Sequence, residues 1–250
     1  MTTASNSIQM ENLITPSNYQ FSAPPIDALG ADSYTLVGIA NDVSSSVSNH
    51  VKEMTKALKA ILNGCAKKCP RAENLMMRLT GFANGVHELH GFREVVTINE
   101  SEYDNILKTG GSTALNDACH EMVESLVSYA KILRDNNFSA NGIIFVITDG
   151  EENDSKHSAK AVNDLITKVN RDESLESLQI ILIGITKGNS TLAQTLADFQ
   201  KESGIDKYIN VNDTTPGKLA KLAEWVSQSV SSTSQALGTG GKSQLTGLTF

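Results

Sequence analysis

The chain has 250 residues, of which 40% are hydrophobic and 20% are charged, and its formal net charge is -7 at pH 7. This length and composition allow a sizeable hydrophobic core. The acidic balance argues against binding to a nucleic-acid backbone, which requires a basic face. No apolar stretch approaches the roughly 18 residues of a membrane span, so we expect neither nucleic acid nor a membrane as partner.

The beginning of the chain shows no clear hydrophobic period. It contains the pair Pro24-Pro25, and we predict an N-terminal arm over residues 1–31. Its first residues are polar and lack the basic and apolar regions of a signal peptide. The 3 cysteines provide no disulfide framework, and Cys65 and Cys69 lack the partners that a zinc site needs. These features favour a cytoplasmic protein, with a virion as the alternative setting.

Strand and helix patterns alternate from residue 32 to residue 230. The apolar run over residues 34–40 predicts a buried strand, and apolar residues at helical spacing from Ser46 to about Cys69 predict a helix that ends before Pro70. Similar patterns predict further strands over residues 75–82, 86–89, 142–148, 178–185 and 208–211, and further helices over residues 114–133, 159–169, 191–202 and 216–230.

Most of the predicted strands are apolar on both faces, and helices separate them. This pattern predicts a doubly wound, Rossmann-like α/β fold in which a mostly parallel six-stranded sheet carries helices on both faces. The Asn84-Gly85 turn predicts a hairpin and hence one antiparallel edge strand. Residues 231–250 are rich in Ser, Thr, Gly and Gln, and we predict a flexible C-terminal tail there.

Side chains with hard oxygen atoms occur where three of these segments end or begin. Asp42, Ser44 and Ser46 follow the first buried strand, Thr113 follows a Gly-Gly-Ser loop and opens a helix, and Asp149 ends the central strand in a Thr-Asp-Gly context. In doubly wound sheets, ligands bind outside the carboxyl ends of the strands. Carboxylate and hydroxyl oxygens suit Mg²⁺, so the pattern predicts a divalent-cation site.

These three pieces, in this order, resemble the von Willebrand factor type A family with its metal-ion-dependent adhesion site (MIDAS). The resemblance covers roughly residues 32–230. The DxSxS motif, the loop threonine and the second aspartate of the family are matched by Asp42, Ser44, Ser46, Thr113 and Asp149. Val43 and Ser45 stand where the family commonly has small residues or Gly, and Ser112 precedes the threonine, so the loop shapes can differ while every ligand is kept.

The resemblance implies a non-catalytic protein-binding module. Its Mg²⁺, with Mn²⁺ or Ca²⁺ as alternatives, would dock an Asp or Glu of a protein partner in an intracellular or virus-borne multiprotein assembly. Neutral hydroxyl ligands support this interpretation, because they leave the ion electron-poor and able to accept an outside carboxylate. Intracellular members of the family often work with ATPase chaperones, which is an analogy from the family alone.

Two other functions stay open. The chain could be a structural assembly subunit, held by its arm and tail, in which the metal site is unused or internally liganded. It could also be a Mg²⁺-dependent phosphohydrolase, although Ser44 stands where proton transfer would need a second acid. Taken one at a time, Ser46 and Asp149 are also ordinary capping and turn residues.

Other polar groups point to no further site. No pair of the 5 histidines has HExxH or HxH spacing, and we expect all of them to be structural. Glu151, Glu152 and Asp154 are predicted to form a solvated acidic rim. Residues 236–243 satisfy a permissive phosphate-loop pattern but lack the preceding strand that such a loop requires.

Overall fold

A six-stranded sheet forms the centre of the computed structural model, which describes residues 9–172 and 174–238. The strand order is β5-β4-β3-β6-β7-β8. The strands are β3 (Ser33–Asp42), β4 (Leu75–Phe82), β5 (Val86–Glu94), β6 (Ser139–Thr148), β7 (Leu178–Ile185) and β8 (Lys207–Val211). The β4–β5 pair is antiparallel, whereas the other pairs in this sheet are parallel. The predicted fold class is confirmed.

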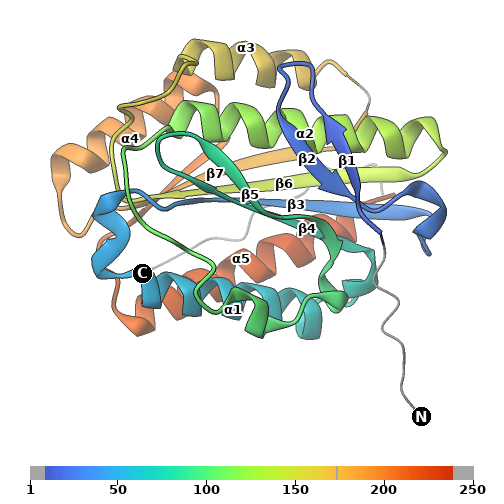
Figure 1. The fold of residues 1–250 in the computed structure, drawn as a ribbon, viewed down its shortest axis with the longest axis horizontal. Helices are drawn as coiled ribbons and strands as arrows, with labels where there is room; N and C mark the ends of the chain where they lie inside the picture. The colour runs from blue at the N-terminus through green and yellow to red at the C-terminus, as the bar shows by residue number, and fades with distance from the viewer. Residues whose placement is uncertain (1–8, 173, 239–250) are drawn as a thin grey trace.

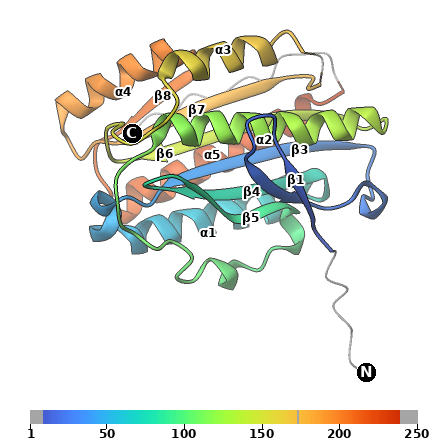
Figure 2. The ribbon, with the colours of Figure 1, turned by 45° about the horizontal axis from the view of Figure 1, so that its top comes forward.

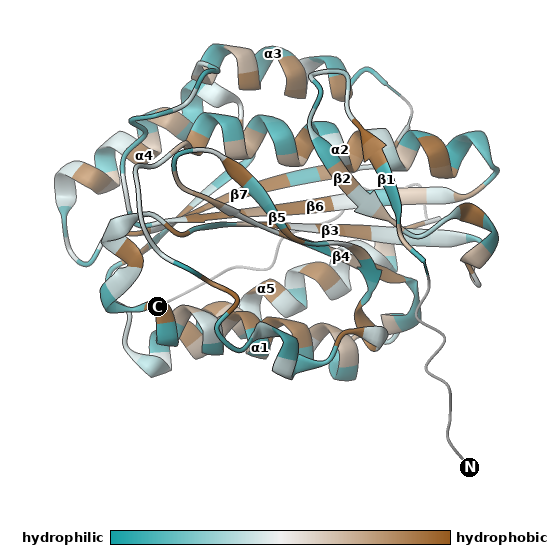
Figure 3. Cartoon of the chain, in the orientation of Figure 1, coloured by the Kyte–Doolittle hydropathy of each residue, from teal (hydrophilic) through white to brown (hydrophobic). Residues whose placement is uncertain are grey.

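Helices cover both faces of the sheet, as Figures 1 and 2 show. The helices α1 (Val51–Lys68) and α5 (Pro216–Ala236) pack on one face, and α2 (Leu115–Asp135), α3 (Ala159–Val169) and α4 (Ser190–Ser203) lie over the other. Because successive side chains of a strand point to opposite faces, neighbouring residues enter different cores. Val37 and Ile39 of β3 face α1 and α5, whereas Leu36 and Ala40 face α2. The brown segments in Figure 3 follow the strands and the inner sides of the helices.

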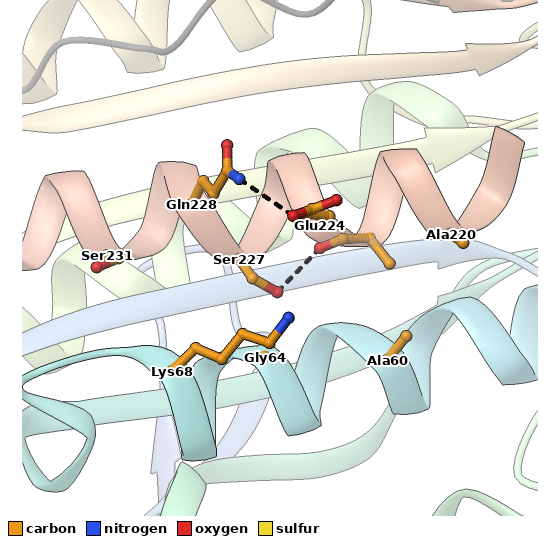
Figure 4. A pocket seen from close by; sticks show the side chains of 9 residues that line it. Ala60, Gly64, Lys68, Ala220, Glu224, Ser227, Gln228 and Ser231 are labelled. Carbon is orange, nitrogen blue, oxygen red and sulfur yellow. Dashed lines mark hydrogen bonds between the residues drawn. The ribbon is translucent and has the colours of Figure 1, made fainter. Parts of the chain in front are cut away.

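The helices α1 and α5 pack closely along a groove lined by small residues and by the longer side chains of Lys68, Glu224 and Gln228 (Figure 4). The groove has a volume of about 310 Å³. Gly64 of α1 allows the close approach, because a Cβ there would collide with the Ser227 hydroxyl of α5. That hydroxyl donates to the Ala223 carbonyl at 2.9 Å and lies 3.3 Å from the Ile61 carbonyl. The groove therefore follows from helix packing, and it lies away from the predicted metal ligands.

Part of the predicted N-terminal arm is a hairpin that packs on the α2 side of the molecule (Figure 1). Its strands are β1 (Glu11–Ile14) and β2 (Gln20–Ala23), and Phe21 is 2% exposed. The Ser22 amide and hydroxyl both donate to Glu88 of β5. The Ser17 amide and hydroxyl donate to Glu124 of α2. These partners are distant in the sequence, so the hairpin left no local pattern by which to predict it.

Several elements differ from their predicted bounds. Residues 45–49 form a 3-10 helix before α1, and β5 continues to Glu94. The helix α5 continues to Ala236, past the predicted start of the tail, because Thr233 and Ser234 are buried against the rest of the molecule. The rest of the predicted tail, from residue 239, lies outside the described residues. No helix in the described ranges is long and apolar enough to cross a membrane.

The sheet topology determines where a ligand site can form. The strand β3 connects through α1 to β4 on one side, whereas β6 connects through α3 to β7 on the other. The chain therefore winds in opposite directions from two neighbouring strands, which makes their carboxyl ends the switch point of the sheet. The first predicted motif follows β3, and Asp149 follows β6.

Candidate metal centre

The five predicted ligands lie together at the carboxyl ends of β3 and β6. Asp42 is the last residue of β3, Ser44 is the N-cap of the 3-10 helix that follows, and Ser46 lies in this helix. Asp149 directly follows β6, and Thr113 lies two residues before the first residue of α2. The structure thus brings all five residues to one end of the sheet.

Asp42 is buried and held by two donors. The residue is only 1% exposed. The Ser44 amide donates to Oδ1 at 2.8 Å, and the Thr148 hydroxyl donates to Oδ2 at 2.6 Å. Burial raises the pKa of Asp42, and the nearby Asp149 raises it further, against the lowering effect of these hydrogen bonds. The pKa direction shows that the fold buries the charged form of this carboxyl group at a cost, to which Asp149 adds.

The two serine hydroxyls connect this aspartate to the second one. The hydroxyl oxygens of Ser44 and Ser46 are 2.9 Å apart, and the Ser46 hydroxyl donates to Oδ1 of Asp149. The side chain of Asp149 is only 1% exposed. Ser45 lies between the two serines but points elsewhere, because its hydroxyl donates to the Gly111 carbonyl at 3.1 Å. The alternation of the DxSxS motif therefore directs two hydroxyls into the site and one away from it.

Thr113 reaches the site because its loop is attached at several points. The Gly110 amide donates to the Val43 carbonyl at 2.8 Å, and the Ser45 amide donates to the Gly111 carbonyl at 3.1 Å. The Thr113 amide donates to Oδ1 of Asn153 at 2.8 Å. Gly111 has a φ of 86°, a conformation that side chains with a Cβ rarely adopt. The Gly-Gly-Ser loop can therefore pass close to the first motif.

Gly150 shows that the oxygens surround one small space. A Cβ placed on Gly150 would lie 3.1 Å from the Thr113 hydroxyl oxygen, and 3.8 Å both from Oδ2 of Asp42 and from the Ser46 hydroxyl oxygen. Hydroxyls and a small number of carboxylates are a suitable donor set for a hard divalent cation. The described residues contain no group of three or more His, Cys, Asp or Glu that could hold a metal ion, so this candidate site depends on its hydroxyls.

Two basic side chains, which no sequence motif indicated, also reach Asp149. The Lys187 ammonium lies 2.9 Å from Oδ2 of Asp149, and Nε2 of His50 lies 3.3 Å from the same oxygen. Burial lowers the pKa of His50, and Lys187 lowers it further. Lys187 follows β7, the neighbour of β6, so the strand order could have located it. No local pattern marked His50, which was expected to be structural.

The predicted acidic rim is correct only in part. Glu151 and Asp154 are exposed, but Glu152 is half-buried. Its carboxylate accepts from the Asn116 amide at 2.8 Å and from the Ser155 hydroxyl at 2.6 Å. Asn116 lies in the first turn of α2, whose free amides attract a negative charge. Glu152 therefore fixes the start of the helix that directly follows the Thr113 loop.

The remaining sequence candidates lie away from this site. All three cysteines are free and buried. His120 and His157 stack with their ring centroids 4.1 Å apart, on the side where Tyr19 of the hairpin packs. The phosphate-loop pattern begins at the last residue of α5, so in the described part of the chain a helix precedes it in place of the required strand. Residues 239–243 of that pattern lie outside the described ranges.

Comparisons with solved structures agree with this geometry at the level of the fold. Similar chains include the PilB minor pilin from Streptococcus sanguinis, with a TM-score of 0.57 and 14% identity over 86% of this chain and 65% of the pilin. A von Willebrand factor type A protein from Catenulispora acidiphila gives 0.54 and 14% over 85% and 44% of the two chains. Proximal thread matrix protein 1 from the mussel byssus, with a zinc-occupied MIDAS motif, gives 0.51 and 15% over 80% and 46%.

This chain spans less than two thirds of each of these three neighbours. A comparison with curated proteins found no match. The model of the von Willebrand factor type A domain matches residues 37–225, a region that begins within β3 and contains all five candidate ligands. Members of this family are protein-interaction modules, and divalent metals bind at their MIDAS. The chain therefore belongs to the von Willebrand factor type A domain family.

Proposed function

We propose that this chain is a non-catalytic protein-binding module whose divalent cation docks an acidic side chain of a partner protein. Asp42, Ser44, Ser46, Thr113 and Asp149 would hold the ion. The ion, Mg²⁺ in the first place and Mn²⁺ or Ca²⁺ otherwise, would supply a Lewis-acidic position for an Asp or Glu carboxylate. The setting that we propose is a cytoplasmic or virus-borne multiprotein assembly, with an ATPase chaperone as one class of partner.

One observation carries this proposal: the oxygens of Thr113, Asp42 and Ser46 surround the same small space beside Gly150. They come from two segments that are far apart in the sequence, each fixed by its own hydrogen bonds, and Gly150 belongs to a third segment. Two carboxylates balance the charge of a divalent ion without excess negative charge, so an outside carboxylate could replace a water ligand without being repelled by surplus negative charge. A phosphohydrolase is disfavoured, because the side chain two residues after Asp42 is a hydroxyl that contacts Ser46.

A second candidate, a structural assembly subunit with an internally liganded site, is favoured by a different observation. Asp149 already receives a hydrogen bond from Ser46 and an ion pair from Lys187. The hairpin β1–β2, in contrast, packs on its own domain, so in this structure it does not extend toward a neighbour. The experiment below separates the two candidates because only the first requires a cation with exchangeable positions.

The test uses Mn²⁺ bound to the protein and measures the longitudinal relaxation rate of water protons. A bound Mn²⁺ that keeps water ligands enhances this relaxation. We expect an enhancement that decreases when N-acetyl-aspartate amide is added, because its carboxylate replaces a water. N-acetyl-asparagine amide, which has the same shape without the charge, should leave the enhancement unchanged.

Variants of neighbouring serines provide the matched control. Ser46→Ala should weaken Mn²⁺ binding at least tenfold, whereas Ser45→Ala should leave it unchanged, because the Ser45 hydroxyl points to the Gly111 carbonyl. Mn²⁺ binding that is indifferent to both substitutions would reject the site. An enhancement that is insensitive to the aspartate probe would reject the docking of an acidic group and favour the internally liganded alternative.

A further inference from the structure

Lys187 lies next to the candidate metal centre, in the turn that follows β7. Gly184 of β7 pairs with Thr148 of β6, so the residues that follow β7 lie beside Asp149. The backbone turns sharply at this point, with a φ of 52° at Lys187 and 81° at Gly188. The Asn189 amide donates to the Thr186 carbonyl at 2.9 Å and closes this turn. The turn directs the Lys187 side chain across the end of β6.

The Lys187 ammonium contacts a carboxylate that has almost no contact with solvent. Its Nζ lies 2.9 Å from Oδ2 of Asp149, and the side chain of Asp149 is 1% exposed whereas that of Lys187 is 43% exposed. The other oxygen of Asp149 receives the Ser46 hydroxyl. The half-exposed lysine can leave without moving the backbone, because its stem is flexible and its ammonium is readily hydrated. His50, whose Nε2 lies 3.3 Å from the same oxygen as the ammonium, has a side chain that is only 5% exposed.

Two positive charges that bind the same carboxylate repel each other, so binding both at once is energetically unfavourable. A divalent cation held by Asp149 would lie within a few ångströms of the ammonium, and their repulsion is large at that distance even in a well-screened environment. The five candidate ligands contain only two carboxylates, so the ammonium neutralises half of their formal negative charge. Cation binding and the Lys187–Asp149 ion pair must therefore compete.

We propose that Lys187 is a built-in counter-ion that regulates the candidate metal site. It pairs with Asp149 when no divalent cation is present, and it weakens cation binding through this competition. When a cation binds, the ammonium leaves Asp149 for solvent at the mouth of the site. There it adds positive charge to the surface that receives the acidic side chain of the partner. The inference rests on the proposed cation site and assigns a regulatory role to a residue outside the five ligands.

The experiment measures the dissociation constant of Mn²⁺ by isothermal titration calorimetry for the wild-type protein and for variants of Lys187. Lys187→Met keeps the length of the side chain and removes its charge, and we expect it to bind Mn²⁺ about tenfold more tightly, a difference of about 1.4 kcal/mol. Lys187→Arg keeps the charge and should bind Mn²⁺ as weakly as the wild type. This difference between the two variants depends on charge and would not follow from a merely structural role.

A lysine elsewhere provides the control. Lys160 forms an exposed ion pair with Asp164 at 2.8 Å on α3, and Lys160→Met should leave Mn²⁺ binding unchanged. The same affinity in Lys187→Met, Lys187→Arg and the wild type, with binding lost in Asp42→Ala, would overturn the inference while the proposed site stands. Mn²⁺ binding that appears only in Lys187→Met would support the inference. Absence of binding in every variant, or binding that survives Asp42→Ala, would overturn the proposed site and the inference together.

Discussion

At the scale of single residues, Asp42 shows how the fold prepares a site for positive charge. Burial raises its pKa, and Asp149 raises it further. For a carboxyl group with a raised pKa, the stabilising contribution is complete below the pKa of the unfolded chain and is lost as the pH rises through the pKa of the folded state. At neutral pH without a cation, the raised pKa of Asp42 therefore lowers the free energy of unfolding relative to low pH.

We expect Asp42→Asn to be at least as stable as the wild type at pH 7 in the presence of a chelator, because the amide removes this electrostatic cost. Mg²⁺ at one hundred times its dissociation constant should stabilise the wild type by about 2.7 kcal/mol and should leave Asp42→Asn unchanged. Thermal denaturation with and without Mg²⁺ measures both effects. Asp164→Asn, on the exposed side of α3, should respond to Mg²⁺ as the wild type does. Equal Mg²⁺ stabilisation of wild type and Asp42→Asn would contradict the role of Asp42.

The candidate ligands could be predicted from the sequence to lie together, whereas the two basic side chains that contact Asp149 could not. Asp42, Ser44, Ser46, Thr113 and Asp149 could be predicted to lie together, because each belongs to a short motif at the end of a recognisable strand or the start of a helix. Their role as metal ligands stays a prediction. Lys187 and His50 could not be found in this way, because their contacts with Asp149 depend on strand pairing and on the turn before α1.

At the scale of elements, the loop before α2 determines where Thr113 lies. Gly111 has a left-handed φ of 86°, and a Cβ there would collide with the Asn84 side chain. We expect Gly111→Ala to weaken Mn²⁺ binding about tenfold or more, because the loop must shift and the left-handed conformation costs about 1–2 kcal/mol for a residue with a Cβ. Isothermal titration calorimetry measures the change.

Gly85→Ala is the matched control for this loop, because a Cβ on Gly85 meets nothing within 4 Å. The variant should bind Mn²⁺ as the wild type does. Circular dichroism should show that both variants stay folded. If Gly111→Ala bound Mn²⁺ with wild-type affinity, Thr113 would not depend on this loop conformation, and its assignment as a ligand would lose its structural basis.

The edge strand β5 contains a histidine that makes stability depend on pH. Nε2 of His90 lies 2.8 Å from the Tyr103 hydroxyl, and the two rings stack. Burial lowers the pKa of His90 from 6.5 to about 4. Between these two pKa values, the histidine is protonated in the unfolded chain and neutral in the folded protein. The free energy of unfolding therefore falls as the pH decreases from the unfolded pKa toward the folded one.

We expect the free energy of unfolding of the wild type to decrease by up to about 3 kcal/mol through His90 alone between pH 7 and about pH 4. His90→Gln can still hydrogen-bond Tyr103 but does not titrate, so its stability should decrease less over the same range. Urea denaturation at the two pH values measures the difference. The same pH dependence in both proteins would show that folded His90 takes up the proton as readily as the unfolded chain.

Element bounds could be predicted where the pattern was strong and local. The strands β4 and β7 and the helix α3 have the predicted bounds, because their apolar residues follow one period and breakers flank them. The hairpin β1–β2 could not be predicted. Its stability comes from Phe21 in the core and from Glu88 and Glu124, whose distance in the sequence hides the contact.

At the scale of the whole molecule, a buried charge network joins four elements on the α2 side. Arg78 of β4 is 1% exposed, and its guanidinium donates to Glu121 of α2 at 2.7 Å and to Glu88 of β5 at 2.8 Å. Glu88 in turn accepts from Ser22 of β2. The network explains how a sheet edge, a helix and the N-terminal hairpin are held in register around a charged group.

We expect Glu121→Ala to reduce the free energy of unfolding by about 3–5 kcal/mol, because it leaves the buried guanidinium with an incomplete set of partners. The double variant Arg78→Met with Glu121→Ala should lose less free energy of unfolding than the sum of the losses of Arg78→Met and Glu121→Ala. Urea denaturation of the single and double variants measures the coupling. Additive losses would show that the two side chains do not act as a pair.

The overall architecture was the most predictable level, because alternating buried strands and helices allow few arrangements and favour the doubly wound sheet. This architecture brings the ends of β3 and β6 together, and the candidate metal centre follows from that placement. The central claim is that the oxygens gathered there bind a divalent cation in competition with Lys187.

Crystals of the protein grown with Mn²⁺ and measured at an anomalous wavelength test this claim most directly. We expect an anomalous peak between the side chains of Asp42, Ser44, Ser46, Thr113 and Asp149, at metal–oxygen distances of about 2.1 Å from its direct ligands, with the Lys187 ammonium withdrawn from Asp149. Well-ordered side chains without a peak there, and an intact ion pair between Lys187 and Asp149 at saturating Mn²⁺, would contradict it.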